Sequence, residues 1–174
     1  MATLNTILDV KPIAQTKSMS CWAAAAAILI GWKKSRTYTE LELATLAGPP
    51  YMDAFNSNTG LSGPQFVDLA TRLGMGTEAP QNFLPAGYET LLKKHGPLWI
   101  AAGLGEGGVR RHVRVLRGIV GDGTFDNTTA YILDPDGGRD YKSTVLQFAQ
   151  ELENIAKDEI AAGHDLYTQV IRYT

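Results

Sequence analysis

The chain of 174 residues contains a single cysteine, Cys21, and only three histidines. No disulfide can form within it, so the fold does not depend on an oxidising compartment. The cysteine and the histidines also lack the closely spaced pairs that zinc ligands on one element require. The sequence therefore predicts no metal site and no organic cofactor.

Strong charge and long apolar runs are also missing. The net charge is −2, and no extended run of lysine or arginine offers a nucleic acid a binding surface. The longest apolar run, 23–30, is too short to span a membrane. Residues 1–10 carry no basic segment and include an acidic residue, which argues against a Sec signal. We expect a protein that is cytoplasmic as synthesised, with a specialised secretion system as the route if it is exported. The sequence identifies neither a delivery partner nor a cognate inhibitor.

What is present is typical of a globular protein, with 44% hydrophobic and 20% charged residues. Helical patterns fill the first part of the chain and alternating strand patterns follow, which predicts an α+β fold in one domain, residues 1–174. A helical half, about 18–96, is expected to pack against an antiparallel sheet half, about 97–174 plus the N-terminal strand. We expect helices at about 20–34, 39–47, 62–73, 85–95 and 147–162, strands at about 3–14, 98–102, 111–120, 130–133 and 166–173, and a loop at 50–60. The second helix is expected to begin with a capping box, Thr39-Glu40-Leu41-Glu42, and to end at Gly48-Pro49-Pro50.

Cys21 stands where the first of these helices begins. Ser20 precedes it as a potential cap, and an alanine-rich run follows it. The first turn of a helix presents free N–H groups and a positive dipole end, both of which favour a thiolate over a thiol. Because a lone cysteine is usually an inert small side chain, this placement alone does not establish a nucleophile.

His112 and Asp134 are predicted to meet across a hairpin. His112 opens the strand at 111–120, a turn follows at 121–124, and Asp134 ends the returning strand. Antiparallel pairing would bring the carboxylate next to the imidazole. Cysteine, histidine and carboxylate are the groups that serve as nucleophile, base and orienting group in thiol hydrolases.

The order Gln15, Cys21-Trp22, His112, Asp134 resembles the papain-like cysteine peptidases. The likeness is greatest to compact bacterial members, such as bacteriocin-leader peptidases and papain-fold effector proteases delivered into host cells. The resemblance implies that Gln15, six residues before the cysteine, donates to the oxyanion. Trp22 is expected to pack in the floor of the cleft while shielding the Cys–His pair, with packing alone as the alternative. The chain departs from plant and lysosomal papains in having Asp rather than Asn as third member and no disulfides.

The sequence thus predicts a cysteine peptidase that cleaves a protein or peptide substrate with Cys21, His112, Asp134 and Gln15. Two alternatives stay open: an amidase acting on cell-wall peptides, and an inactive papain-like module that binds a peptide. We also expect Trp22 and the glycine-rich loop containing Gly105 and Gly107 to contact substrate.

Other conspicuous residues are assigned structural roles. Residues 134–140 resemble the start of a calcium loop, but the twelfth position is Val145 rather than glutamate, so we expect a turn. His95 and His164 are predicted to lie at the surface. The arginines at 110, 111, 114 and 117 are predicted to form a solvent-exposed strand face, with a substrate-facing patch as the alternative.

Overall fold

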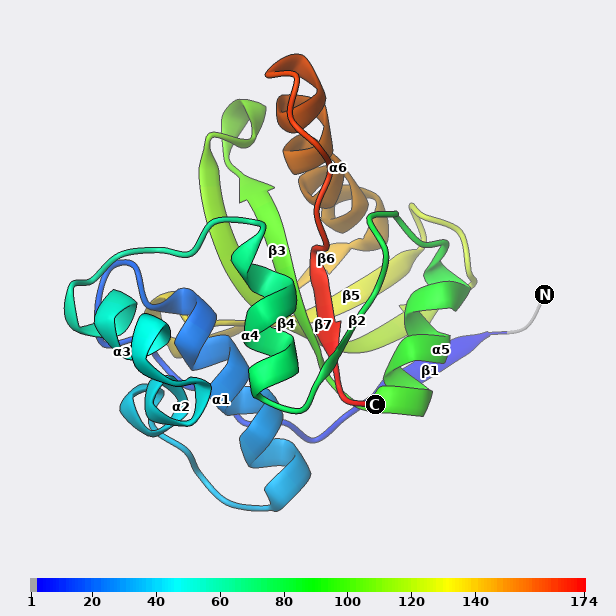
Figure 1. Ribbon diagram of the computed structural model, residues 1–174. Coiled ribbons are helices and arrows are strands. Elements are labelled where there is room, and N and C mark those ends of the chain that lie inside the picture. Colours follow the sequence, from blue (N-terminus) through cyan, green and yellow to red (C-terminus); the bar gives the residue numbers. More distant parts are fainter. Residues whose placement is uncertain (1–2) are drawn as a thin grey trace.

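The computed structural model describes residues 3–174 (Figure 1). Seven strands form one antiparallel sheet in the order β2-β7-β3-β4-β5-β6, and β1 pairs with β4. This arrangement confirms the predicted α+β class. The helices are α1 (Cys21–Lys34), α2 (Glu40–Ala47), α3 (Pro49–Asn56), α4 (Gln65–Arg72), α5 (Pro85–His95) and α6 (Val145–Ala161). The strands are β1 (Leu4–Ile7), β2 (Gly76–Thr77), β3 (Leu98–Leu104), β4 (Arg110–Gly121), β5 (Thr128–Asp134), β6 (Arg139–Thr144) and β7 (Val170–Arg172).

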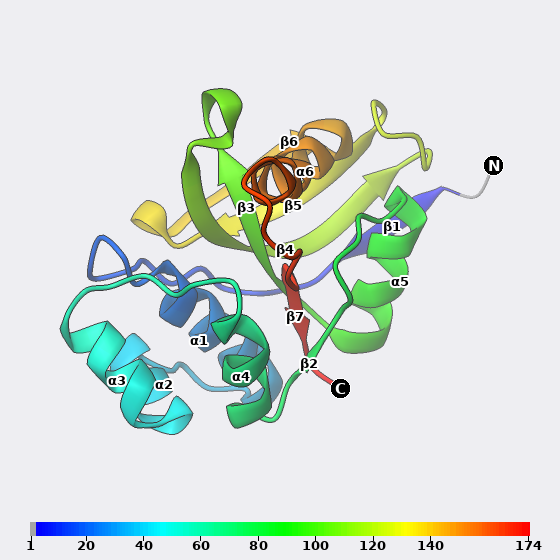
Figure 2. The ribbon, with the colours of Figure 1, turned by 45° about the horizontal axis from the view of Figure 1, so that its top comes forward.

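The sheet is covered on both faces. One apolar cluster joins helices α1 to α4 to Trp99 and Val115, and a second joins α5 and α6 to Ile100 and Leu116. Alternate residues of β3 therefore enter different cores, and all seven are buried. Figure 2 shows α1 to α4 grouped together, apart from α5 and α6. The expected helical half, 18–96, is thus divided, because α5 belongs to the second core.

Residues 50–60 are mostly helical rather than a loop. Helix α3 begins at Pro49, where the missing N–H of proline costs nothing and its fixed φ suits a first turn. Tyr51 and Phe55, one turn apart, are both buried. The prolines that appeared to terminate α2 instead start the next helix.

The capping box at the start of α2 is confirmed. The Glu42 N–H donates to Thr39 Oγ1 over 3.1 Å, and the Thr39 N–H donates to Glu42 Oε2 over 2.7 Å. Two strands are shorter than expected, since β1 covers only Leu4–Ile7 and β7 only Val170–Arg172.

The prediction of an exposed arginine face is wrong for Arg114, whose side chain is 1% exposed. Its guanidinium donates to Glu151 Oε2 and to the Tyr141 hydroxyl, each over 2.6 Å. Strand β4 lies in the interior of the sheet, where the long side chain finds partly buried partners instead of water. Arg110 and Arg111, at the start of the strand, are exposed. Within residues 3–174, no helix is long and apolar enough to cross a membrane.

Candidate active site

Cys21 is the first residue of α1 and is half-buried, whereas the residues from Trp22 to Ile30 are buried. Ser20 occupies the N-cap position. The prediction that its side chain caps the helix is wrong, because the side chain makes no capping hydrogen bond. Its hydroxyl instead donates to Glu40 Oε1 over 2.5 Å. The helix thus begins at the cysteine as expected, without the expected side-chain cap.

His112 and Asp134 are in direct contact. His112 Nε2 lies 2.6 Å from Asp134 Oδ1, and both side chains are almost fully buried. The sheet register pairs Val115 with Leu133, which brings Asp134, the next residue of β5, to the start of β4. Because an ionised carboxylate only accepts hydrogen bonds, Nε2 carries the hydrogen and Nδ1 of the neutral ring keeps its lone pair.

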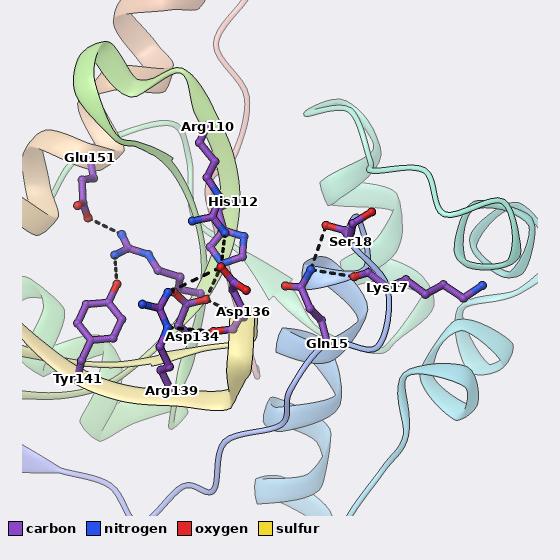
Figure 3. Close-up of polar contacts among 11 residues, drawn as sticks. Gln15, Lys17, Ser18, Arg110, His112, Asp134, Asp136, Arg139, Tyr141 and Glu151 are labelled. Carbon is purple, nitrogen blue, oxygen red and sulfur yellow. Dashed lines mark hydrogen bonds and ion pairs between the residues drawn. The ribbon is translucent and has the colours of Figure 1, made fainter.

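Asp134 is held by three donors. Besides the imidazole, the Asp136 N–H donates to Oδ1 over 2.9 Å and Arg139 Nη2 donates to Oδ2 over 2.8 Å (Figure 3). The 3-10 turn Asp136–Gly138, which follows β5, presents the first of these donors. The segment expected to be a turn therefore fixes the carboxylate.

The pair is electrostatically matched. Burial opposes protonation of His112, but its contacts with Asp134 and Cys21 outweigh burial and raise the pKa of the imidazole. Burial likewise opposes the charged form of Asp134, yet the His112 contact, the Asp136 N–H and Arg139 lower the pKa of its carboxyl. The raised pKa of His112 and the lowered pKa of Asp134 both favour a protonated imidazole beside an ionised carboxylate.

Cys21 and His112 line one cavity of about 210 Å³. Much of its wall is apolar, and Arg110 and Arg111 also line it. The remaining lining residues are Ser18, Met19, Trp22, Gly60, Leu61, Phe66, Ala101, Ala102, Val113, Ile155 and Tyr167. The thiol and the imidazole thus share a space that a small peptide side chain or backbone segment can enter.

Gln15 precedes this site in the segment that enters α1. Its backbone N–H donates to Pro135 O over 2.7 Å, which ties the segment to the turn after Asp134. Its side-chain Nε2 donates to Lys17 O over 2.8 Å and to Ser18 O over 3.0 Å (Figure 3). The amide therefore holds the turn before Cys21, and a bond to an oxyanion requires exchange of one of these contacts.

A model of the family described as papain-like cysteine protease AvrRpt2 matches residues 4–153 of the chain. The chain belongs to this family. It is a papain-like cysteine peptidase, as its residue order predicted. No curated protein sequence matches the chain.

A solved structure supports the fold of this papain-like peptidase. The crystal structure of a double glycine motif protease from an AMS/PCAT transporter, in complex with the leader peptide, aligns over 100% of both chains with a TM-score of 0.50. The sequences are 19% identical. Such a likeness establishes a shared arrangement of helices and strands.

Of the residues expected to contact substrate, Trp22 lines the cavity of this peptidase, whereas Gly105 and Gly107 do not. Trp22 lines the cavity with its side chain 1% exposed, and its ring packs 5.9 Å from that of Tyr51. Gly105 and Gly107 are absent from the cavity wall. They lie at the turn between β3 and β4, just before the start of the strand that carries His112. The structure thus gives no contact that supports the prediction for these glycines.

The two other histidines lie outside the site. His95 is buried rather than exposed, because α5 packs its last turn against the fold. Burial, with Arg172 and Lys94 nearby, lowers the pKa of its imidazole. His164 is exposed as predicted and contacts Glu159 over 3.0 Å. Among residues 3–174, His, Cys, Asp and Glu form no group of three or more suited to a metal ion.

Apart from Trp22, sequence analysis missed the apolar cavity wall, and it also missed one buried carboxylate. The aromatic residues Phe66 and Tyr167 come from α4 and from the segment before β7, and their rings pack 5.6 Å apart. Only the three-dimensional fold brings them to Cys21. Glu40 appeared in the sequence solely as part of a capping box, although it contacts the segment next to the cysteine.

Proposed function

We propose that the chain hydrolyses peptide bonds with Cys21 as nucleophile, His112 as general base and acid, and Asp134 as the group that orients the imidazole. The observation that carries the proposal is the buried 2.6 Å contact of His112 Nε2 with Asp134, beside a cavity that also holds Cys21. This contact leaves Nδ1 to exchange a proton with the thiol.

The reaction begins when the Cys21 thiol passes its proton to His112 Nδ1. The thiolate attacks the carbonyl carbon, a C–S bond forms, and the carbonyl π electrons move to oxygen. When the oxygen lone pair re-forms the carbonyl, the C–N bond breaks and the His112 imidazolium donates its proton to the departing amine. Water then attacks the thioester, giving a proton to Nδ1, and the acid leaves as the C–S bond breaks. The enzyme returns to its starting state.

The oxyanion needs donors near Cys21. The Cys21 N–H is the first candidate, because it opens α1 and has no backbone acceptor within residues 3–174. The second is the Gln15 amide, which would exchange its 3.0 Å contact with Ser18 O for the oxyanion. Removal of one such donor typically lowers kcat by about 100- to 1,000-fold.

An extended peptide is the substrate class that best suits the cavity. Leu61, Phe66 and Ile155 give its wall an apolar character, which suits an apolar side chain near the scissile bond. Arginines that face the cavity would favour acidic residues, but Arg110 and Arg111 each already pair with a carboxylate, over 2.8 Å with Asp136 and 3.2 Å with Asp158. Their charges are therefore largely offset, and we propose an apolar rather than an acidic preference.

The comparison with the solved structure is consistent with a peptide occupant. The double glycine motif protease was solved with a leader peptide, and the family description names AvrRpt2. We propose that this chain also acts on a peptide segment, and that it functions as a bacterial effector.

The test compares wild type with Cys21→Ala on a library of internally quenched peptides and on purified muropeptides. Cleavage of peptides with an apolar residue near the cut, lost in Cys21→Ala, supports the proposal. Activity confined to muropeptides would assign the protein to cell-wall amidases. Peptide binding without turnover of either substrate by folded protein would indicate an inactive binding module.

A further inference from the structure

Glu40 is a buried carboxylate whose partners all come from the segment that enters α1. Its side chain belongs to the first turn of α2 and is 4% exposed. Oε2 accepts the Thr16 N–H over 2.9 Å and also the Thr16 hydroxyl, and Oε1 accepts the Ser20 hydroxyl over 2.5 Å. One carboxylate thus holds both ends of the turn that lies between Gln15 and Cys21.

This carboxylate has no ion-pair partner among residues 3–174. Burial of a charge is costly unless it is paired or well hydrogen-bonded. Glu40 obtains its stabilisation from the two hydroxyls and one backbone N–H of the turn. The bonds are therefore strong charge-assisted contacts, and the turn and the carboxylate hold each other in place.

Ser20 shows that the contact takes precedence over local helix stability. A serine at the N-cap normally accepts an N–H of the first turn, and this contact is worth about 1 kcal/mol. Here the hydroxyl donates to Glu40 and makes no capping bond. The serine side chain is 1% exposed, so its direction is fixed by the interior of the protein.

The same turn is anchored from a second side. The Met19 N–H donates to Asn58 Oδ1 over 2.9 Å, and Asn58 Nδ2 donates to Ser18 Oγ over 2.9 Å. Lys17 Nζ reaches the last turn of α3, where it donates to Phe55 O over 2.9 Å. These contacts are exposed or half-buried, whereas the contact between Ser20 and Glu40 is buried.

We infer that Glu40 is a positioning residue that fixes the turn before Cys21 and thereby the two oxyanion donors. The Ser20 side chain determines the position of the peptide unit that carries the Cys21 N–H, and Thr16 follows Gln15 directly. The inference rests on the proposed function, because it assigns Glu40 to the oxyanion step of that reaction. Glu40 acts through the turn and does not itself contact the substrate.

Glu40→Gln is the test, since it keeps the shape of the side chain and replaces one acceptor oxygen with an NH₂ group. The amide cannot accept all three donors, so the turn shifts away from its oxyanion position. We expect kcat for the best-cleaved peptide of the library to fall about 10- to 100-fold, because loss of a complete donor costs about 100- to 1,000-fold. KM should stay within about threefold, as the loss concerns the transition state.

Glu89→Gln is the matched control. Glu89 is also a buried glutamate, 8% exposed, and it accepts the Asn5 N–H over 2.9 Å and the Thr6 hydroxyl over 2.8 Å. It belongs to α5, in the second core. Its substitution should lower the melting temperature and leave kcat within about twofold of wild type.

Alkylation of Cys21 by iodoacetamide separates positioning from damage to the nucleophile. Alkylation needs the thiolate but forms no oxyanion, so Glu40→Gln should be alkylated within about threefold of the wild-type rate while peptide turnover is lost. If Glu40→Gln does not fold, Ser20→Ala is the second variant. It removes the buried donor to Glu40 together with the acceptor of the 3.2 Å bond from the Lys17 N–H, both within the same turn. Its kcat should fall about 3- to 10-fold with KM unchanged.

The outcomes that overturn the inference are distinct from failure of the proposed function. Wild-type kcat in folded Glu40→Gln, or in Ser20→Ala where the first variant does not fold, rejects Glu40 while leaving the Cys21 chemistry intact. Equal losses of alkylation and turnover reject it as well, because they indicate general disruption of the site. Absence of peptide turnover in wild type rejects both proposals together.

Discussion

Asp134→Asn separates the charge of the carboxylate from its shape. The asparagine oxygen can keep the bonds from His112 Nε2 and the Asp136 N–H, which both end on Oδ1 in the wild type. Its NH₂ group then faces Arg139, whose side chain is 57% exposed and can turn into water. We therefore expect the fold to survive the substitution.

The expected loss follows from the kind of hydrogen bond. A bond to a charged group contributes about 1.5–3 kcal/mol and a neutral one about 0.5–1.5 kcal/mol. The difference of about 1–1.5 kcal/mol corresponds to a roughly tenfold fall in kcat/KM near neutral pH. Asp134→Ala should cost far more, because it leaves the buried His112 and Asp136 N–H groups without an acceptor.

Asp134→Asn should also shift the pH dependence of kcat/KM, and the structure gives the direction of that shift. Despite burial, the contacts with Asp134 and Cys21 raise the pKa of His112. In the proposed mechanism, the active form holds the Cys21 thiolate beside the His112 imidazolium. This pair is lost when the imidazolium deprotonates, so the pKa of His112 sets the basic limb of kcat/KM. Removal of the negative charge at Asp134 lowers the pKa of His112 and should move the basic limb to lower pH.

The assay is kcat/KM for a quenched peptide from pH 5 to pH 10, with Asp140→Asn as the control. Asp140 pairs with Arg117 over 2.9 Å and is 44% exposed, so its substitution removes the same charge from outside the cavity. An unchanged basic limb in Asp134→Asn, or an equal shift in Asp140→Asn, would refute the reasoning.

Three further predictions concern the stability of the fold. Gly63→Ala should destabilise the protein by about 1–3 kcal/mol and raise KM, because its Cβ would lie 2.3 Å from the Tyr167 ring at the cavity wall; calorimetry and peptide kinetics test both effects. Glu151→Ala should cost about 3–5 kcal/mol in urea unfolding by leaving buried Arg114 unpaired, with unchanged turnover of the folded fraction. For His95, burial lowers the pKa in the folded state, so stability should fall as pH decreases below the ordinary value of about 6.5, and His95→Gln should remove this dependence in melting curves.

The sequence predicted those features that depend on local pattern. The start of α1 at Cys21, the capping box at Thr39 and the hairpin linking His112 to Asp134 each follow from residues close together in the chain. Antiparallel pairing then determines the contact between imidazole and carboxylate, and the hydrogen bond of 2.6 Å agrees with that expectation.

The features that sequence analysis missed depend on distant partners. Ser20 was expected to cap α1, but Glu40, twenty residues later, binds its hydroxyl. Arg114 was expected to face solvent, but Glu151 lies 37 residues away in the chain and pairs with it in the interior. A pattern within one strand or helix cannot show which side chain of another element will satisfy a polar group.

Capture of the covalent intermediate tests the central claim most directly. Wild type is mixed with its best peptide substrate, quenched in acid within the first turnover, and digested with trypsin, which releases residues 18–33 as the peptide containing the only cysteine. We predict that this peptide carries the acyl part of the substrate as a thioester, and that Cys21→Ala gives neither the adduct nor turnover. Turnover by Cys21→Ala, or an acyl group on any other residue, would contradict the assignment of Cys21 as the nucleophile.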